Sequence, residues 1–219
     1  MTDQILAAIS KAYPLKELDC GSFATCKVSG IMFQVRQFEA AGLGNVSVMS
    51  GSGMLGAMKM DTLIVNPFDV DAPLFSYDRI HAMGNDTLFL EIFETRLNPT
   101  PAEQLRPVVE AYKDLPDSDA GVHWYEDIRW KESVKKVGKK KDVTARYDAM
   151  TADFVAAFLA ICKAAPACDR TAKMQSAAAY TEGLLKNGGP AADSFLKAYG
   201  PEKTGELFRS HLFATGTQA

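Results

Sequence analysis

The chain has 219 residues, of which 47% are hydrophobic and 23% are charged, and its formal net charge is −3. This length and apolar content suit one substantial core and predict a single domain over residues 1–219. The charge gives no electrostatic footprint for nucleic acid, and no run approaches the roughly 18 apolar residues of a membrane span. Residues 1–13 contain no cationic, apolar leader, so we expect a cytoplasmic protein that binds neither nucleic acid nor membrane.

Extended segments dominate the first half. A short helix is predicted over Asp3–Ala12, capped by Thr2 and stopped by Pro14. Four strands bounded by turn residues follow: Cys26–Glu39, Val46–Ser50, Leu55–Asn66 and Thr87–Arg96. Because parallel pairing needs long crossovers, these short connections favour an antiparallel meander.

Helical patterns dominate the second half. Thr100, Pro101 and Glu103 predict a capping-box start for a helix that ends near Lys113. Four further helices are predicted: Tyr147–Ala164, Ala172–Lys186, Pro190–Tyr199 and Pro201–His211. Strands followed by helices indicate a layered α/β fold in which helices cover an antiparallel sheet.

Three acids, Asp69, Asp71 and Asp78, lie where a strand runs into a proline-containing turn, in the segment NPFDVDAPLFSYD. An acid that is held still and partly desolvated at a strand end can have a pKa near neutrality, which suits a proton donor. Short acids also hydrogen-bond their own backbone in turns, and this structural role is the commoner one for acids in such a segment.

Glu91 is the other candidate acid, within the strand segment TLFLEIFETR. Alternation places it on the same face as Phe89 and Phe93. If helices cover that face, Glu91 is a buried acid that needs a partner. If the face meets water, Glu91 is an ordinary surface residue.

Metal and cofactor signals are weak. Cys20 and Cys26 have the same spacing as Cys162 and Cys168, but zinc and iron–sulfur pairs are usually separated by about two to four residues. The three histidines are scattered, and His123 beside Trp124 is the most notable. The glycine-rich turns lie among strands, outside the strand-to-helix context of a dinucleotide site. We therefore expect no metal, no permanently bound cofactor and reduced, mostly buried thiols.

A run of lysines occupies the connection before the long apolar helix. Its members are Lys131, Lys135, Lys136, Lys139, Lys140 and Lys141. In an acidic protein such a patch can dock an acidic partner or an anionic group. A solvated loop produces the same pattern.

Two separated segments resemble the ferredoxin-dependent bilin reductases. The C-terminal segment contains Tyr180, LLKNGG around Asn187, LKAYG ending at Gly200, and Leu212–Phe213, and the central segment is DAPLFSYD. The resemblance implies a three-layer α/β/α sandwich with a central, mainly antiparallel sheet. It also implies a linear tetrapyrrole held between that sheet and the C-terminal helices that cover one face.

The resemblance further implies reduction by single electrons from ferredoxin, with protons from protein carboxylates. For this chain it makes Asp69 the favoured donor, Asp71 the next, and Glu91 a third acid in the pocket. Asp71 and Asp78 are then interpreted mainly as parts of the turn around Pro73. Two proton handlers of the family are replaced here, since Val48–Ser50 stand where a histidine can occur and a glycine follows Asn187.

The same resemblance implies a set of contact residues. Substrate contacts are expected from Arg36, Gln37, Asn66, Tyr180 and Asn187, although strand alternation prevents all of them from sharing one face. Lys135, Lys136, Lys139 and Lys140 would dock the acidic ferredoxin. The leading hypothesis is a bilin reductase, the second is a non-catalytic tetrapyrrole carrier with the same fold, and the third is chemistry on an unrelated small molecule in the same cleft.

Overall fold

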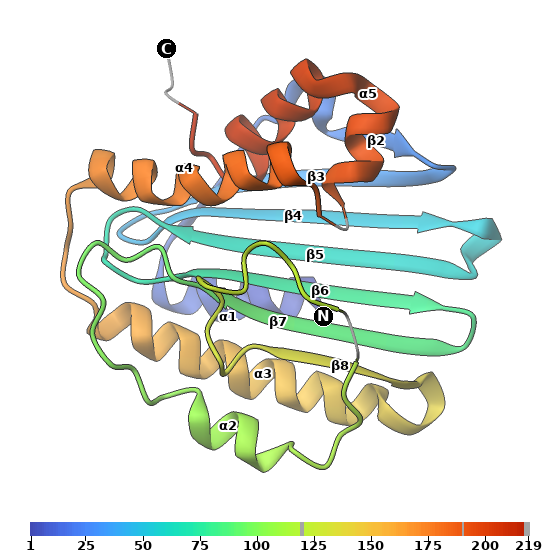
Figure 1. Cartoon of the computed structure of the whole chain (residues 1–219), viewed down its shortest axis with the longest axis horizontal. Coiled ribbons are helices and arrows are strands. Elements are labelled where there is room, and N and C mark those ends of the chain that lie inside the picture. The colour runs from blue at the N-terminus through green and yellow to red at the C-terminus, as the bar shows by residue number, and fades with distance from the viewer. Residues whose placement is uncertain (119–120, 190, 217–219) are drawn as a thin grey trace.

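A twisted antiparallel sheet forms the centre of the molecule (Figure 1). The computed structural model describes residues 1–118, 121–189 and 191–216. Its strands are β1 (Leu15–Leu18), β2 (Thr25–Val28), β3 (Ile31–Ala40), β4 (Gly44–Gly53), β5 (Met58–Pro67), β6 (Leu74–Ala82), β7 (Asn85–Phe93) and β8 (Val134–Lys139). Within the described residues the order is β1-β3-β4-β5-β6-β7-β8, and β2 pairs with the same edge of β3 as β1 does.

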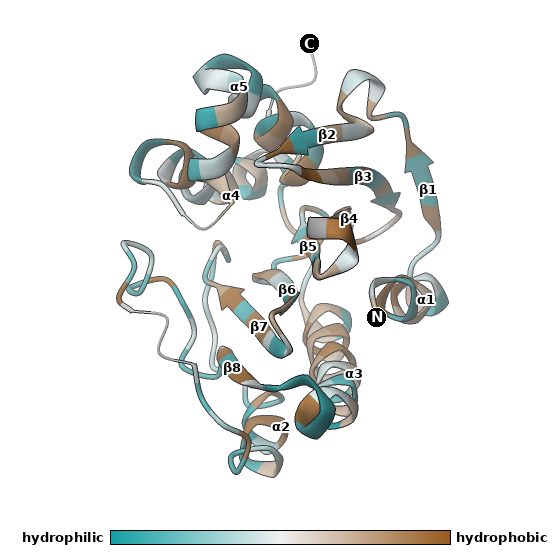
Figure 2. Ribbon diagram, turned by 90° about the vertical axis from the view of Figure 1, so that its right-hand side faces the viewer, coloured by the Kyte–Doolittle hydropathy of each residue, from teal (hydrophilic) through white to brown (hydrophobic). Residues whose placement is uncertain are grey.

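Helices cover both faces of this sheet (Figure 2). They are α1 (Thr2–Ala12), α2 (Arg106–Ala111), α3 (Lys140–Ala164), α4 (Arg170–Asn187) and α5 (Ala192–Glu206), with a π-helical segment, η3 (Leu207–Leu212), and two single turns, η1 (Gly21–Phe23) and η2 (Met54–Gly56). α1 and α3 lie on one face, and α4, α5 and η3 lie on the other. The predicted three-layer α/β/α sandwich with a mainly antiparallel sheet is confirmed.

Two apolar clusters, one on each face, hold the layers together. On the first face Phe75 of β6 contacts the rings of Phe154 and Phe158 from α3. On the second face Phe33 of β3 contacts Phe195 of α5. Because both faces are covered, the central strands are buried on both sides and show little polar alternation. No helix of the described residues is long and apolar enough to cross a membrane.

The structure corrects several predicted elements. The proline-containing turn ends at Pro73 and β6 begins at Leu74, so Asp78 is a strand residue and not part of the turn. Apart from Lys131, which lies in a turn, the lysine run is not a loop, because it forms the edge strand β8 and the first turn of α3. The helix predicted from Thr100 begins only at Arg106.

Two further boundaries depend on backbone geometry. The strand predicted from Cys26 is divided by a turn at Ser29 and Gly30, both with positive φ, into β2 and β3. The last two predicted helices correspond to α5 and η3, with a kink within α5 at Gly200, where φ is 75°. Pro190, the predicted start of the first of them, lies outside the described residues.

Candidate functional site

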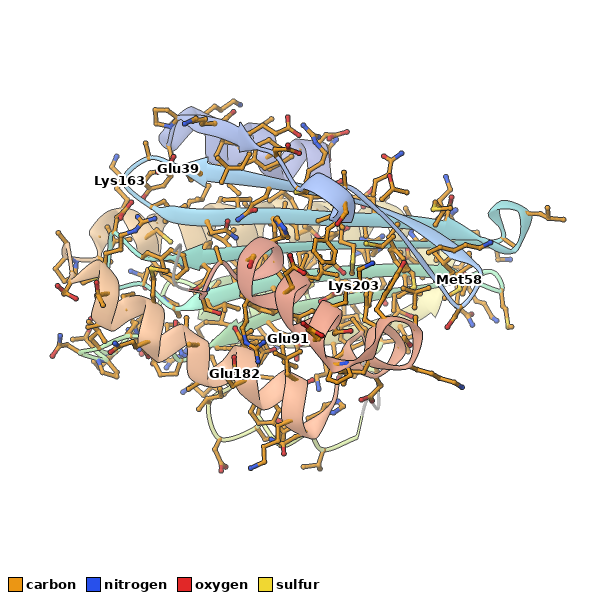
Figure 3. All side chains as sticks on the ribbon, turned by 90° about the horizontal axis from the view of Figure 1, so that it is seen from above. Glu39, Met58, Glu91, Lys163, Glu182 and Lys203 are labelled. Atoms are coloured by element: carbon orange, nitrogen blue, oxygen red, sulfur yellow. The ribbon has the colours of Figure 1, made fainter. Side chains whose placement is uncertain are left out.

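A cavity of about 560 Å³ lies between the second face of the sheet and the C-terminal helices. Its volume falls in the range of small-molecule sites, roughly 300–1,000 Å³. Figure 3 shows Glu91 near the middle of the sheet, where the C-terminal helices cross the view. Most lining side chains are apolar: Val28, Ile31, Phe33, Met49, Met58, Met60, Ile64, Ile80, Phe89, Leu184, Ala191, Ala192, Phe195, Phe208, Leu212 and Phe213.

Strand register brings the polar lining residues together. One row of paired residues crosses the sheet from β5 to β8. It consists of Thr62, Asp78, the apolar Phe89 and Lys135, each opposite the next. The adjacent row on the same face pairs Ser76 with Glu91. Since every second residue of a strand shares a face, both rows line the cavity.

Asp78 lies at the centre of this polar group. The Thr62 hydroxyl donates a hydrogen bond to its Oδ1 at 2.5 Å, and the Ser76 hydroxyl donates to its Oδ2 at 3.0 Å. Burial raises the pKa of Asp78 above its usual range, although these two hydrogen bonds oppose the shift. A carboxyl that holds its proton more strongly than an ordinary aspartate is suited to act as a general acid.

Glu91 is the second carboxyl of the cavity and is only 8% exposed. Burial and the nearby charge of Asp78 raise its pKa to about 7, against the opposing charges of Lys135 and Arg129. Its Oε1 lies 3.8 Å from Lys135 Nζ and 4.0 Å from Arg129 Nε. Glu91 can therefore gain and lose a proton near neutral pH.

Aromatic rings form one wall. Tyr180 of α4 stacks on Phe93 with ring centroids 4.4 Å apart, and Tyr125 meets the same ring edge-on. His123 stacks on Tyr125 at 5.0 Å. Burial raises the pKa of Tyr125 and of Tyr180, so both remain neutral phenols. The wall offers flat apolar surface to a planar ligand.

Of the residues predicted to contact substrate, only Tyr180 is among the described lining residues. Gln37 and Asn66 donate hydrogen bonds from their amides to the carbonyls of Ser210 and Phe213, at 3.0 and 2.8 Å, so they hold the C-terminal segment on the sheet. Arg36 is exposed on the other face.

Arg36 donates from Nε to Glu17 at 2.7 Å. Asn187 is exposed at the end of α4 and does not line the cavity. Strand alternation already kept the five predicted substrate contacts from sharing one face, and of these five the structure brings Tyr180 alone to the cavity. The reason is that Arg36 points to the opposite face of its strand and Asn187 lies at a helix end.

Asp69 and Asp71 lie outside the cavity. Asp69 accepts a hydrogen bond at 2.5 Å from Arg170. Asp71 is 5% exposed and accepts bonds from the backbone N–H groups of Leu97 and Asn98, at 2.7 and 2.9 Å. Neither position suits the predicted proton donor, because these acids stabilise the chain around the turn.

Two of the predicted docking lysines, Lys136, which is buried, and Lys135, have little exposed surface, so neither suits that role. Lys136 donates to the carbonyl of Leu115 at 2.8 Å and to Asp117 at 2.6 Å. The side chain of Lys135 is 10% exposed and lines the cavity. Lys139 and Lys140 are exposed, and their docking role stays a prediction.

Asp78 and Lys135 were missed as pocket residues. The signal for Asp78 was the alternation of Ser76, Asp78 and Ile80 on one face of a strand.

The described residues contain no group of three or more His, Cys, Asp or Glu side chains that could hold a metal ion. The four cysteines are free thiols, and Cys168 is the least buried of them.

The fold is similar to that of phytochromobilin synthase from tomato, solved in complex with biliverdin. The TM-score is 0.76, the sequence identity is 12%, and the match covers 99% of this chain and 83% of that one. The mixed α/β fold implied by the bilin-reductase resemblance is thus confirmed. No protein-family profile and no curated protein matches the sequence.

Proposed function

We propose that this protein binds a linear tetrapyrrole in the cavity and reduces it. The observation that carries the proposal is the pair of carboxyls, Asp78 and Glu91, which lie on neighbouring strands in a largely apolar cavity with raised pKa values. The fold shared with a protein that holds biliverdin supports the choice of ligand. The aromatic wall around Tyr180 suits a conjugated, planar molecule.

Reduction of one bilin double bond requires two electrons and two protons. In the proposed reaction ferredoxin supplies the electrons one at a time, and Asp78 and Glu91 supply the protons. The hydroxyls of Thr62 and Ser76 stabilise the Asp78 carboxylate that remains after proton transfer. Solvent protons then restore both carboxyls for the next reduction.

The electron donor is proposed to dock near the junction of β8 and α3. Lys139 and Lys140 are exposed there, and Lys141 follows them on the first turn of α3. This patch is complementary to an acidic ferredoxin, and docking through it should weaken as ionic strength rises.

The test mixes the purified protein with biliverdin, records the absorption spectrum, and then adds reduced ferredoxin without oxygen. We expect a shifted bilin band followed by spectral conversion, and a rate at least about 100-fold lower in Asp78→Asn. Asp69→Asn is the matched control, because Asp69 lies outside the cavity, and its rate should equal that of the wild type. Binding without conversion would favour a carrier. The absence of binding would contradict both tetrapyrrole functions.

A further inference from the structure

Lys135 and Glu91 place a hydrogen-bond donor and a hydrogen-bond acceptor next to each other, and both atoms lack a hydrogen-bond partner in the described part of the chain. Lys135 Nζ and Glu91 Oε1 are buried, and neither has a hydrogen-bond partner among the residues that the structure describes. They lie 3.8 Å apart, too far for a direct hydrogen bond, and each side chain is 10% exposed. Buried charged groups without hydrogen bonds are costly, so this pair favours a ligand that bonds to both.

The surrounding charges leave this pair available to a ligand. Glu126 lies 3.8 Å from Lys135 Nζ, but its carboxylate is already bonded to Arg129. Arg129 approaches Glu91 only to 4.0 Å. Asp78 is bonded to two hydroxyls of its own sheet.

Strand geometry fixes the direction of the pair. Lys135 lies opposite Phe89 on the neighbouring strand, and Glu91 follows Phe89 by two positions on β7, so all three side chains share the cavity face. Of the described lining residues, Lys135 is the one lysine or arginine. A ligand in the cavity therefore meets a donor and an acceptor side by side on a rigid floor.

We propose that Lys135 and Glu91 together bind the lactam edge of a terminal ring of the ligand. A lactam carries its N–H and its C=O on adjacent atoms, so the carbonyl accepts from Lys135 Nζ while the N–H donates to Glu91 Oε1. The proton that Glu91 supplies in the proposed reduction is then carried on its other oxygen, Oε2. The inference rests on the proposed function, because the ligand is taken to be a linear tetrapyrrole whose end rings are lactams. The ammonium would also stabilise negative charge that electron transfer places on the lactam oxygen.

Calorimetric titration with two small probes tests this pairing. The first probe is a dipyrrinone, which joins one lactam ring to one pyrrole, and the second is its lactim methyl ether, which lacks both the N–H and the carbonyl. We expect the wild type to prefer the dipyrrinone by at least about 10-fold. Lys135→Met should abolish this preference, whereas Lys131→Met, at an exposed position just before the same strand, should retain it.

Equal affinity of the wild type for the two probes would overturn the inference, and so would an unchanged preference in a folded Lys135→Met variant. The comparison of the two probes on the wild type stands even if that variant does not fold. Biliverdin titrated in parallel separates the two levels of the argument. If biliverdin binds but the dipyrrinone does not, the lactam site is wrong and the proposed function stands. If biliverdin does not bind, both are contradicted.

Discussion

Replacing Glu91 with glutamine should remove a large pH dependence from the stability of the protein. Burial and the charge of Asp78 raise the pKa of Glu91 in the folded state to about 7, whereas in the unfolded chain it is near 4.3. Between these values the folded protein holds a proton that the unfolded chain releases. Protonated Glu91 therefore favours the folded state at low pH, and the free energy of unfolding falls as pH rises from the unfolded-state pKa toward the folded-state pKa.

The magnitude follows from the two pKa values. One pKa unit corresponds to about 1.36 kcal/mol, so ionising Glu91 should cost about 2–3 kcal/mol of unfolding free energy between pH 5 and pH 8. Glutamine keeps the shape of the side chain but does not ionise. The variant should therefore gain this amount relative to the wild type as pH increases over the same range.

Urea unfolding at pH 5 and pH 8 measures the effect in both proteins. Glu94→Gln is the control. Burial raises the pKa of Glu94, but hydrogen bonds from Arg96 outweigh burial and lower the pKa below its usual value. Glu94 is thus ionised in both states across this range, and its substitution should have the same effect at both pH values. If Glu91→Gln shows the same pH dependence as the wild type, the raised pKa is refuted.

Three further predictions concern single contacts. A methyl group at Gly183 would overlap the indole of Trp124, so Gly183→Ala should lower stability by about 1–3 kcal/mol in urea unfolding, and unchanged stability would argue against this packing. Lys135→Met removes a charge that lowers the pKa of Glu91, so carboxyl-carbon NMR should show a higher pKa, and an unchanged value would contradict their coupling. Asp71→Ala leaves two backbone N–H groups without their acceptor and should cost about 1–3 kcal/mol, with biliverdin affinity unchanged; weaker binding would place Asp71 in the site.

The sequence predicted the layers better than it predicted the strand that matters most. Apolar stripes identified the long helices, and short connections identified the antiparallel meander. The caps predicted at Thr2 and Thr100 are not formed. β6 was not recognised, because Pro73 and three acids suggested a turn and because Ser76 and Asp78 interrupt an otherwise apolar strand. Polar side chains fit at these two positions because both line the cavity and do not pack into the apolar core.

The site depends on contacts that local sequence does not reveal. Glu91 was recognised because alternation along a single strand was enough to pose the question of its burial. Lys135 was interpreted as a solvent-exposed docking residue, since a run of lysines usually marks a solvated surface. Its place beside Glu91 is set by the register of β7 with β8, two strands separated by a long connection in the chain.

The most direct test of the central claim is a single-turnover reduction of the biliverdin complex by reduced ferredoxin, followed by absorption without oxygen. The account predicts that the wild type converts bound biliverdin to a reduced bilin. It predicts that Asp78→Asn accepts an electron but stalls before proton transfer. Bound biliverdin that stays unchanged in the wild type, or equal rates in the two proteins, would contradict the assignment of this cavity as a reductase site with Asp78 as its acid.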